Sequence, residues 1–307
     1  MISLFGLDPA TYRPHAIHTG ERTYPETNCY TDIVVELLHA HGDEPLAAMG
    51  FLVRMDFEGD QWTFFKPPPE DLETLFGVDI HEMQPYRPLT AQVEEQLAAG
   101  RTMTIEVDSW HLPDTTATSY RSEHVKTSII PETIDAEAEL LRYFHNAGFY
   151  ELTGEDFRGV FHVDGLPPYT ELVRFDAGSR LEGEVLRGTS RALLRQHLER
   201  RPATNPFDRF SEHLTGVLPR LVEGESSDYH AYAFATVRLV GSAFEIAASY
   251  VDWLLGGGPA AESFTRIVEG SKTLSLKLAR QRAFDPAPTL YELGCAWDEG
   301  MHALEAA

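Results

Sequence analysis

The stretch Asn28-Cys-Tyr-Thr-Asp-Ile-Val-Val-Glu-Leu-Leu-His-Ala-His-Gly42 determines how the first half of the chain folds. Asn28 is a good N-cap, and it predicts a helix that runs from Cys29 to about His41. Gly42 then ends the helix, because glycine readily adopts the left-handed conformation that follows a last helical turn. Four apolar side chains share one face of this helix, namely Ile33, Val34, Leu37 and Leu38. The stretch therefore predicts a core helix with a cysteine in its first turn.

The place of Cys29 suits a nucleophile. Free N–H groups and a partial positive charge at a helix N-terminus favour thiolate over thiol. The same N–H groups could stabilise an oxyanion if the sulfur attacks a carbonyl group. The alternative is that Cys29 is a small buried apolar residue, as most free cysteines are. Cys295 lies within a predicted helix from Leu290 to Trp297, and we interpret it as structural.

A cysteine nucleophile needs a base, and the base needs a group that orients it. Alternating apolar residues predict strands at Thr102–Asp108 and His124–Ile130, and a further strand is expected at Leu140–His145. His124 opens the second strand and Asn146 follows the third, so the order cysteine, histidine, asparagine is that of papain-like enzymes. His145 is the alternative base if the strand register differs from the predicted one.

The rest of the pattern predicts an α+β domain at residues 1–165 and a helical domain at residues 166–307, joined through Val163–Tyr169. The first domain also carries two short strand-like runs, at residues 52–57 and 61–65, and a capping-box pattern at Thr153 and Asp156. Apolar periodicity between Pro and Gly residues predicts a helical bundle in the second domain. Its helices are expected at residues 180–201, 207–222, 228–255, 260–282 and 287–305.

Composition limits the classes of function. The 307-residue chain has a formal net charge of −23, which argues against general nucleic-acid binding. Its two cysteines lie so far apart in the sequence that they make a poor case for a disulfide. We therefore expect a reduced compartment. The first residues do not resemble a signal peptide, and four polar side chains interrupt the apolar run Tyr229–Leu255, which favours a buried helix over a membrane span. We therefore expect a cytoplasmic protein that does not bind membranes.

Three runs of the sequence resemble the bacterial family of domain of unknown function 1839. They are Glu26-Thr-Asn-Cys-Tyr-Thr-Asp32, Asp56-Phe-Glu-Gly-Asp-Gln-Trp-Thr-Phe-Phe-Lys-Pro-Pro68 and Tyr143-Phe-His-Asn-Ala-Gly-Phe-Tyr150. The first half is also distantly similar to the N-terminal domain of the butirosin-biosynthesis aminoacyltransferase family, a papain-like fold followed by a helical domain. That resemblance implies a cysteine that takes an acyl or aminoacyl group from a carrier protein.

Carried onto this sequence, the resemblance implies that Cys29 is the nucleophile, His124 the base and Asn146 the orienting residue. Papain-like enzymes often have an oxyanion glutamine six residues before the cysteine, where this chain has Thr23. Asn28 and Thr23 are therefore candidates for the oxyanion donor, with the Cys29 N–H. The implied function is aminoacyl or acyl transfer from a carrier-protein thioester to a small acceptor. The alternatives are a thiol hydrolase or amidase, and a carrier-protein binding module without turnover.

Other charged groups suggest partners rather than cofactors. Arg187, Arg191 and Arg195 recur every four residues on a predicted helix, within a segment of net charge +4 at residues 187–201. They form either a solvated face or a dock for an acidic carrier protein and its phosphopantetheine phosphate. No familiar metal-ligand spacing is matched by His15-x-x-His18, His39-x-His41 or the group Asp108, His111 and Asp114, so we expect a solvated acidic surface and no metal. No cofactor of the chain's own is expected.

Overall fold

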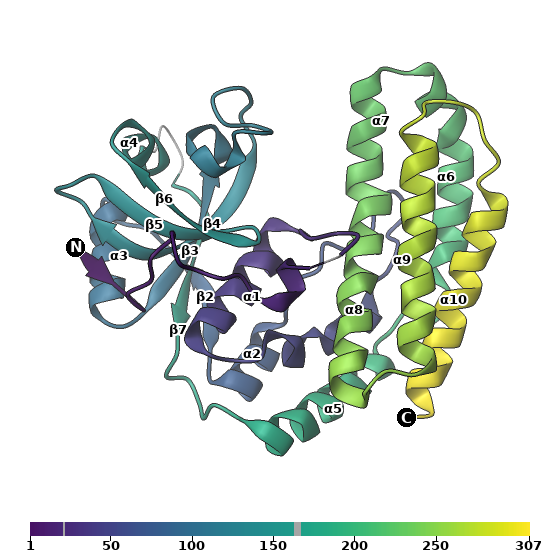
Figure 1. Cartoon of the computed structure of the whole chain (residues 1–307), viewed down its shortest axis with the longest axis horizontal. Helices are drawn as coiled ribbons and strands as arrows, with labels where there is room; N and C mark the ends of the chain where they lie inside the picture. Colours follow the sequence, from purple (N-terminus) through teal and green to yellow (C-terminus); the bar gives the residue numbers. More distant parts are fainter. Residues whose placement is uncertain (21, 163–166) are drawn as a thin grey trace. The chain divides into compact units, whose positions relative to one another are not determined.

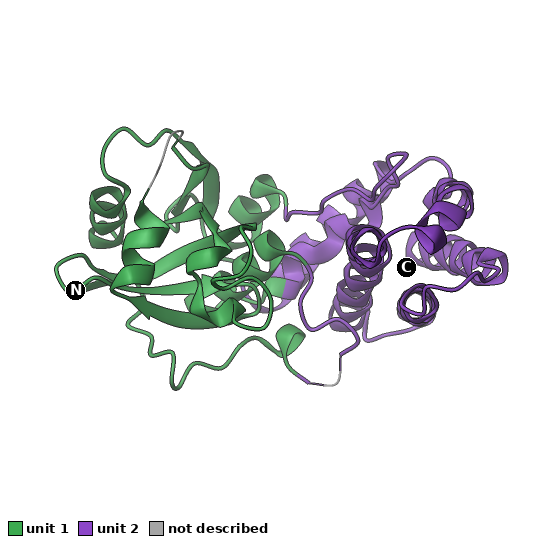
Figure 2. Ribbon diagram, turned by 90° about the horizontal axis from the view of Figure 1, so that it is seen from above, with its two compact units in different colours: residues 1–19, 28–45, 68–181 green, residues 20–27, 46–67, 182–307 purple. Residues whose placement is uncertain are grey.

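A computed structural model describes residues 1–20, 22–162 and 167–307, and it divides the chain into two compact units (Figure 2). The first comprises residues 1–19, 28–45 and 68–181, and the second residues 20–27, 46–67 and 182–307. The expected boundary after residue 165 falls outside the described residues. Residues 163–166 of the expected linker also lie outside them. Strand β7 (Thr170–Arg174) lies beyond that boundary and pairs within the first unit, which therefore extends to Leu181.

The first unit is built on one antiparallel sheet in the order β2-β7-β3-β4-β5-β6, and β1 pairs with β4 (Figure 1). The strands are β1 (Ile2–Ser3), β2 (Asp79–Met83), β3 (Thr102–Asp108), β4 (Lys126–Asp135), β5 (Leu140–His145) and β6 (Gly148–Thr153), besides β7. The expected strand from His124 thus begins two residues later and is longer. The register of β3 and β4 places Asp108 opposite Lys126, at one end of the sheet.

Alternate residues of each strand point to opposite faces of the sheet. On β5, Tyr143 packs in an apolar cluster with α3 (Leu89–Ala98), whereas Phe144 meets Tyr12 on the other face, with ring centroids 5.8 Å apart. Helix α1 (Cys29–His41) lies against β4 and β5. The first unit also contains α2 (Pro69–Phe76), α4 (Glu155–Phe161) and the short 3-10 helices η1 (Ala16–His18), η3 (Ser109–His111) and η4 (Pro113–Thr115).

A buried charged cluster joins η1 to α1. His18 Nδ1 lies 2.5 Å from a Glu36 oxygen, and its Nε2 lies 3.1 Å from an Asp32 oxygen. Tyr12 Oη donates to the second oxygen of Glu36 at 2.5 Å, and the His15 N–H donates to Glu36 at 3.0 Å. The expectation of a solvated surface is therefore wrong for His18, because its ring is closed inside the fold by two carboxylates.

The second unit is predominantly helical, as the periodicity predicts. Its elements are η2 (Pro45–Arg54, from Leu46 on), α5 (Gly183–Glu199), α6 (Pro206–Glu223), α7 (Ser226–Ala233), the π-helical turn η5 (Phe234–Arg238), α8 (Leu239–Leu255), α9 (Pro259–Leu278) and α10 (Ala287–Glu305). The continuous helix Ser226–Leu255 is long and apolar enough to cross a membrane, but 61% of its most apolar window is buried in the structure. Burial of this kind is typical of the core helix of a bundle.

Two local expectations are wrong. The runs at residues 52–57 and 61–65 form the end of η2 and a single bridge between Phe57 and Trp62. Both aromatic rings pack against Phe210 of α6, at centroid distances of 5.5 Å or less, so packing in the second unit overrides their strand propensity. The capping box is absent, because Gly154 rather than Thr153 is the N-cap of α4 and makes no side-chain capping bond.

Candidate functional site

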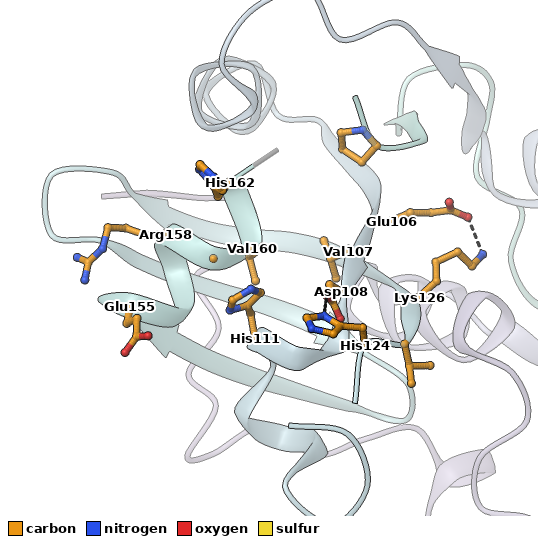
Figure 3. Close-up of a pocket in the computed structure, with 13 residues that line it drawn as sticks. Glu106, Val107, Asp108, His111, His124, Lys126, Glu155, Arg158, Val160 and His162 are labelled. Atoms are coloured by element: carbon orange, nitrogen blue, oxygen red, sulfur yellow. Dashed lines mark hydrogen bonds and ion pairs between the residues drawn. The ribbon is translucent and has the colours of Figure 1, made fainter. Parts of the chain in front are cut away.

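A hollow of about 740 Å³ lies in the first unit, beside the ends of β3 and β4 and helix α4 (Figure 3). Three histidines and five charged side chains line it, together with apolar side chains of β3 and α4. The lining residues are Glu106, Val107, Asp108, His111, His124, Val125, Lys126, Glu155, Arg158, Gly159, Val160, His162 and Pro168. A hollow of this size and polarity suits a small polar molecule.

Within this hollow, Asp108 orients His124. The Nδ1 atom of His124 lies 2.5 Å from Oδ2 of Asp108 (Figure 3). The imidazole also stacks on the Trp110 ring at a centroid distance of 4.6 Å. Burial alone would raise the pKa of Asp108, but hydrogen bonds from His124 and from the Trp110 N–H outweigh it and lower that pKa. An ionised Asp108 holds the ring so that Nε2 is the nitrogen available to a substrate, as in a histidine–aspartate pair of an acid–base catalyst. The His124 side chain is 72% exposed.

His111 is packed tightly against α4. A Cβ atom built on Gly159 would lie 2.1 Å from Nδ1 of His111, so only glycine at this position leaves room for the imidazole. Because His111 and His124 both line the hollow, this close approach gives the site a second imidazole beside the first. His111 is one of the residues expected on a solvated surface, without a functional role.

The cations of the hollow have partners of their own. Lys126 donates to Glu106 at 2.7 Å, and Arg158 is paired with Glu139. A bound molecule would therefore meet both signs of charge in the hollow, rather than a row of uncompensated cations. Among the described residues no group of three or more His, Cys, Asp and Glu is arranged to hold a metal ion.

Cys29 occupies the first position of α1, as predicted, but the structure gives it no hydrogen bond to His124 within the described residues. The Asn28 side chain caps the helix by accepting from the N–H groups of Tyr30 and Thr31, at 3.1 and 2.9 Å. The Cys29 N–H belongs to the same first turn but makes no bond to the Asn28 side chain. Asn28 Nδ2 donates to the Thr31 hydroxyl at 3.3 Å, so this candidate for the oxyanion donor is already engaged.

Thr23, the other candidate for the oxyanion donor, belongs to the second unit. Its backbone N–H donates to Glu245 at 2.8 Å, so that N–H serves to anchor the segment before α1. The Thr23 main chain is thus committed to a structural bond.

Asn146 is a turn residue. It begins the two-residue connection between β5 and β6 and has a left-handed φ of 45°, which asparagine tolerates better than most residues. The His124 ring nitrogen that Asn146 was expected to hold is bonded to Asp108 instead. In the structure the partner of His124 Nδ1 is thus Asp108, and the catalytic roles of Cys29, His124 and Asn146 stay predictions.

His145, the alternative base, lies in a closed network. Its Nδ1 is 2.5 Å from Asp114 Oδ2, and its Nε2 is 2.8 Å from the Thr127 hydroxyl. Tyr143 donates to the other oxygen of Asp114 at 2.5 Å. All four side chains are largely buried, so this network satisfies polar groups inside the fold and offers no ring nitrogen to a substrate.

A simple pairing rule could have identified Asp108. Consecutive strands usually pair in an antiparallel sheet, so the end of the strand Thr102–Asp108 should lie beside the start of a strand near His124. That argument places a carboxylate next to the imidazole without any family resemblance. No comparable signal in the sequence places His111 against Gly159.

The arginines expected to dock a carrier protein lie on α5 of the second unit. Arg187 stacks over the Trp253 ring at 4.5 Å and donates to the Trp253 carbonyl, so it secures α8. Arg191 is half-buried and Arg195 is exposed. In the described ranges, neither of these two side chains has a hydrogen bond or an ion pair. They are the members of the row available to a partner.

Comparison with known families follows the same division of the chain. The DUF1839 N-terminal domain matches residues 13–175, and the DUF1839 C-terminal domain matches residues 183–306. The chain belongs to the DUF1839 family. The two matches correspond to a mixed domain with an antiparallel sheet and an all-helical domain, so this member is a two-domain α+β protein. No curated protein matches the chain.

Proposed function

We propose that this DUF1839 protein transfers an acyl or aminoacyl group from a carrier-protein thioester to a small polar acceptor, with His124 as the general base. The observation that carries the proposal is an imidazole fixed through Nδ1 by Asp108 at the edge of a polar hollow of about 740 Å³. A base held in this way can take a proton from a bound hydroxyl or amine. The distant similarity of the first half to the butirosin-biosynthesis aminoacyltransferase family supports the choice of a thioester as the acyl donor.

In the direct route, His124 Nε2 removes the proton from the acceptor's hydroxyl or amine as that group attacks the thioester carbonyl. The new bond joins the acceptor to the acyl carbon, and the carbon–sulfur bond of the donor breaks. His124 then returns the proton to the departing thiolate of the carrier. This route needs no contact between Cys29 and His124, which is consistent with the bonds of both residues.

A covalent route is the second candidate, and the position of Cys29 at the start of α1 favours it. In this route the Cys29 thiolate attacks the thioester carbonyl, the carbon–sulfur bond of the donor breaks, and the carrier leaves as its thiol. The acceptor then attacks the acyl-Cys29 thioester, gives up its proton and releases the Cys29 thiol. Hydrolysis is the same chemistry with water as the acceptor. A binding module without turnover would use neither route.

The routes differ in what intact mass spectrometry detects after mixing with an aminoacyl-loaded carrier protein. We expect the direct route to give transfer without an adduct, and Cys29→Ala to retain transfer within about twofold, because it removes no group that acts on the acceptor. A stable adduct that Cys29→Ala abolishes would establish the covalent route instead. Cys295→Ala is the matched control and should change neither result. No transfer and no adduct with any loaded carrier would contradict both routes and leave the binding module.

Charge reversal on α5 tests the carrier as the partner. Arg191→Glu with Arg195→Glu should weaken transfer from a loaded carrier and spare a small thioester, because charges at the rim of an interface act mainly on association. The loss should become smaller as salt screens the native attraction. Arg220→Glu, a single charge reversal at an exposed position of α6, is the control for each of the two reversals made alone. Equal use of both donors by the reversed protein would show that α5 presents only a solvated face.

A further inference from the structure

The segment of residues 23–27, directly before α1, is held by its main chain to the long helix of the second unit. The Glu245 carboxylate accepts the N–H groups of Thr23 and Tyr24, each at 2.8 Å. The two oxygens take one N–H each, so the carboxylate fixes two consecutive peptide units. Hydrogen bonds to a charged group are stronger than those between neutral groups.

Arg238 holds the other end of the same segment. Its guanidinium donates to the carbonyl of Glu26 at 2.9 Å and to the carbonyl of Thr27 at 2.8 Å. Arg238 is the last residue of the π-helical turn η5, within the helix Ser226–Leu255. Turns of this kind rotate the residues around them and occur often at functional positions.

Between these two residues, Gly241 lets the segment approach the helix. A Cβ atom on Gly241 would lie 2.6 Å from the ring of Tyr24, which is buried. Arg238, Gly241 and Glu245 are spaced by three and four residues, so they share one face of the helix. We call these three residues the α8 clamp. They hold the segment through two N–H groups, two carbonyls and one ring.

The clamped segment leads directly into the helix that carries Cys29. Thr27 is followed by Asn28, whose side chain caps α1, and then by Cys29 at the first helical position. We propose that Arg238 and Glu245 are positioning residues for the first turn of α1, so that the α8 clamp controls the reactivity of Cys29. The effect on the thiol is independent of the reaction proposed above.

Alkylation of Cys29 by iodoacetamide in the native protein tests this assignment. Arg238→Gln and Glu245→Gln should each raise the labelling rate of Cys29 about tenfold, because each removes charge-assisted bonds and lets the segment open locally. Hydrogen exchange of a peptide covering residues 23–32 should become faster in the same variants. Arg238→Lys, which keeps the charge but not the two-pronged geometry, should lie between the parent and Arg238→Gln.

Cys295 is the internal reference, and Arg266→Gln, an arginine of α9 paired with Glu299, is the matched control. Cys295 should label at the parent rate in every variant, and Cys29 should label at the parent rate in Arg266→Gln. Unchanged labelling and exchange in all three clamp variants would overturn the assignment. An equal rise for Cys29 and Cys295 would also overturn it, since general loosening of the fold would then explain the result.

Discussion

His124→Gln should abolish most of the transfer activity, with a loss of about 10²–10⁴-fold in kcat, the range expected when a general base is removed. Glutamine is close in size to histidine and can still meet Asp108, but it cannot accept a proton at physiological pH. The measurement is steady-state transfer from a loaded carrier or a small thioester to the acceptor. Because both donors require the same proton transfer, the loss should be similar for the two.

Asp108→Asn should also lower kcat in the same assay, by up to about 10⁴-fold. It keeps a hydrogen-bonding side chain beside Nδ1 but no longer favours the tautomer that leaves Nε2 free to accept a proton. His81→Gln is the matched control, because His81 and Asp79 form a similar pair at 2.9 Å that does not line the hollow. If His124→Gln transfers as fast as the parent protein, the hollow is not the site of the reaction.

Much of the fold could be predicted, because local signals and tertiary packing agree there. The helix Cys29–His41 and the strands Thr102–Asp108 and Leu140–His145 have the expected bounds, since caps, turn residues and periodicity all point the same way. The runs at residues 52–57 and 61–65 could not be predicted from local pattern. Their aromatic residues pack with α6, more than 140 residues later in the chain, and that contact has no local signature.

The site was predicted less well, because it depends on which strands are neighbours. His124 could be proposed as a base from its position at a strand start, but the residue that lies beside it depends on the pairing of β3 with β4. Family order suggested Asn146, whereas the two-residue turn after His145 needs a left-handed residue at that position. Asparagine suits both a left-handed turn position and the orienting position of a catalytic triad. The residue type at position 146 therefore does not distinguish a turn from a triad.

The cluster around His18 makes the stability of the first unit sensitive to pH. Burial alone would lower the pKa of His18, but its hydrogen bonds to Asp32 and Glu36 and the charges of both raise it from 6.5 to about 9. A protonated imidazole between two buried carboxylates leaves one negative charge to be stabilised, and Tyr12 and the His15 N–H donate to Glu36. Removing one partner of such a cluster leaves a buried charge uncompensated, which typically costs about 3–5 kcal/mol.

His18→Gln should therefore lower the free energy of unfolding by about 3–5 kcal/mol at pH 6. Because the pKa of His18 is higher in the folded state, its contribution is complete below about pH 6.5 and is lost as the pH rises through 9. The difference between parent and variant should consequently shrink by about 3 kcal/mol between pH 6 and pH 10, since each pKa unit corresponds to about 1.4 kcal/mol. Urea denaturation across this pH series measures the difference, and hydrogen exchange of α1 peptides localises it to the first unit. His81→Gln, at an exposed ion pair, should show neither effect. A constant difference between parent and His18→Gln at all pH values would mean that His18 is not protonated inside the fold.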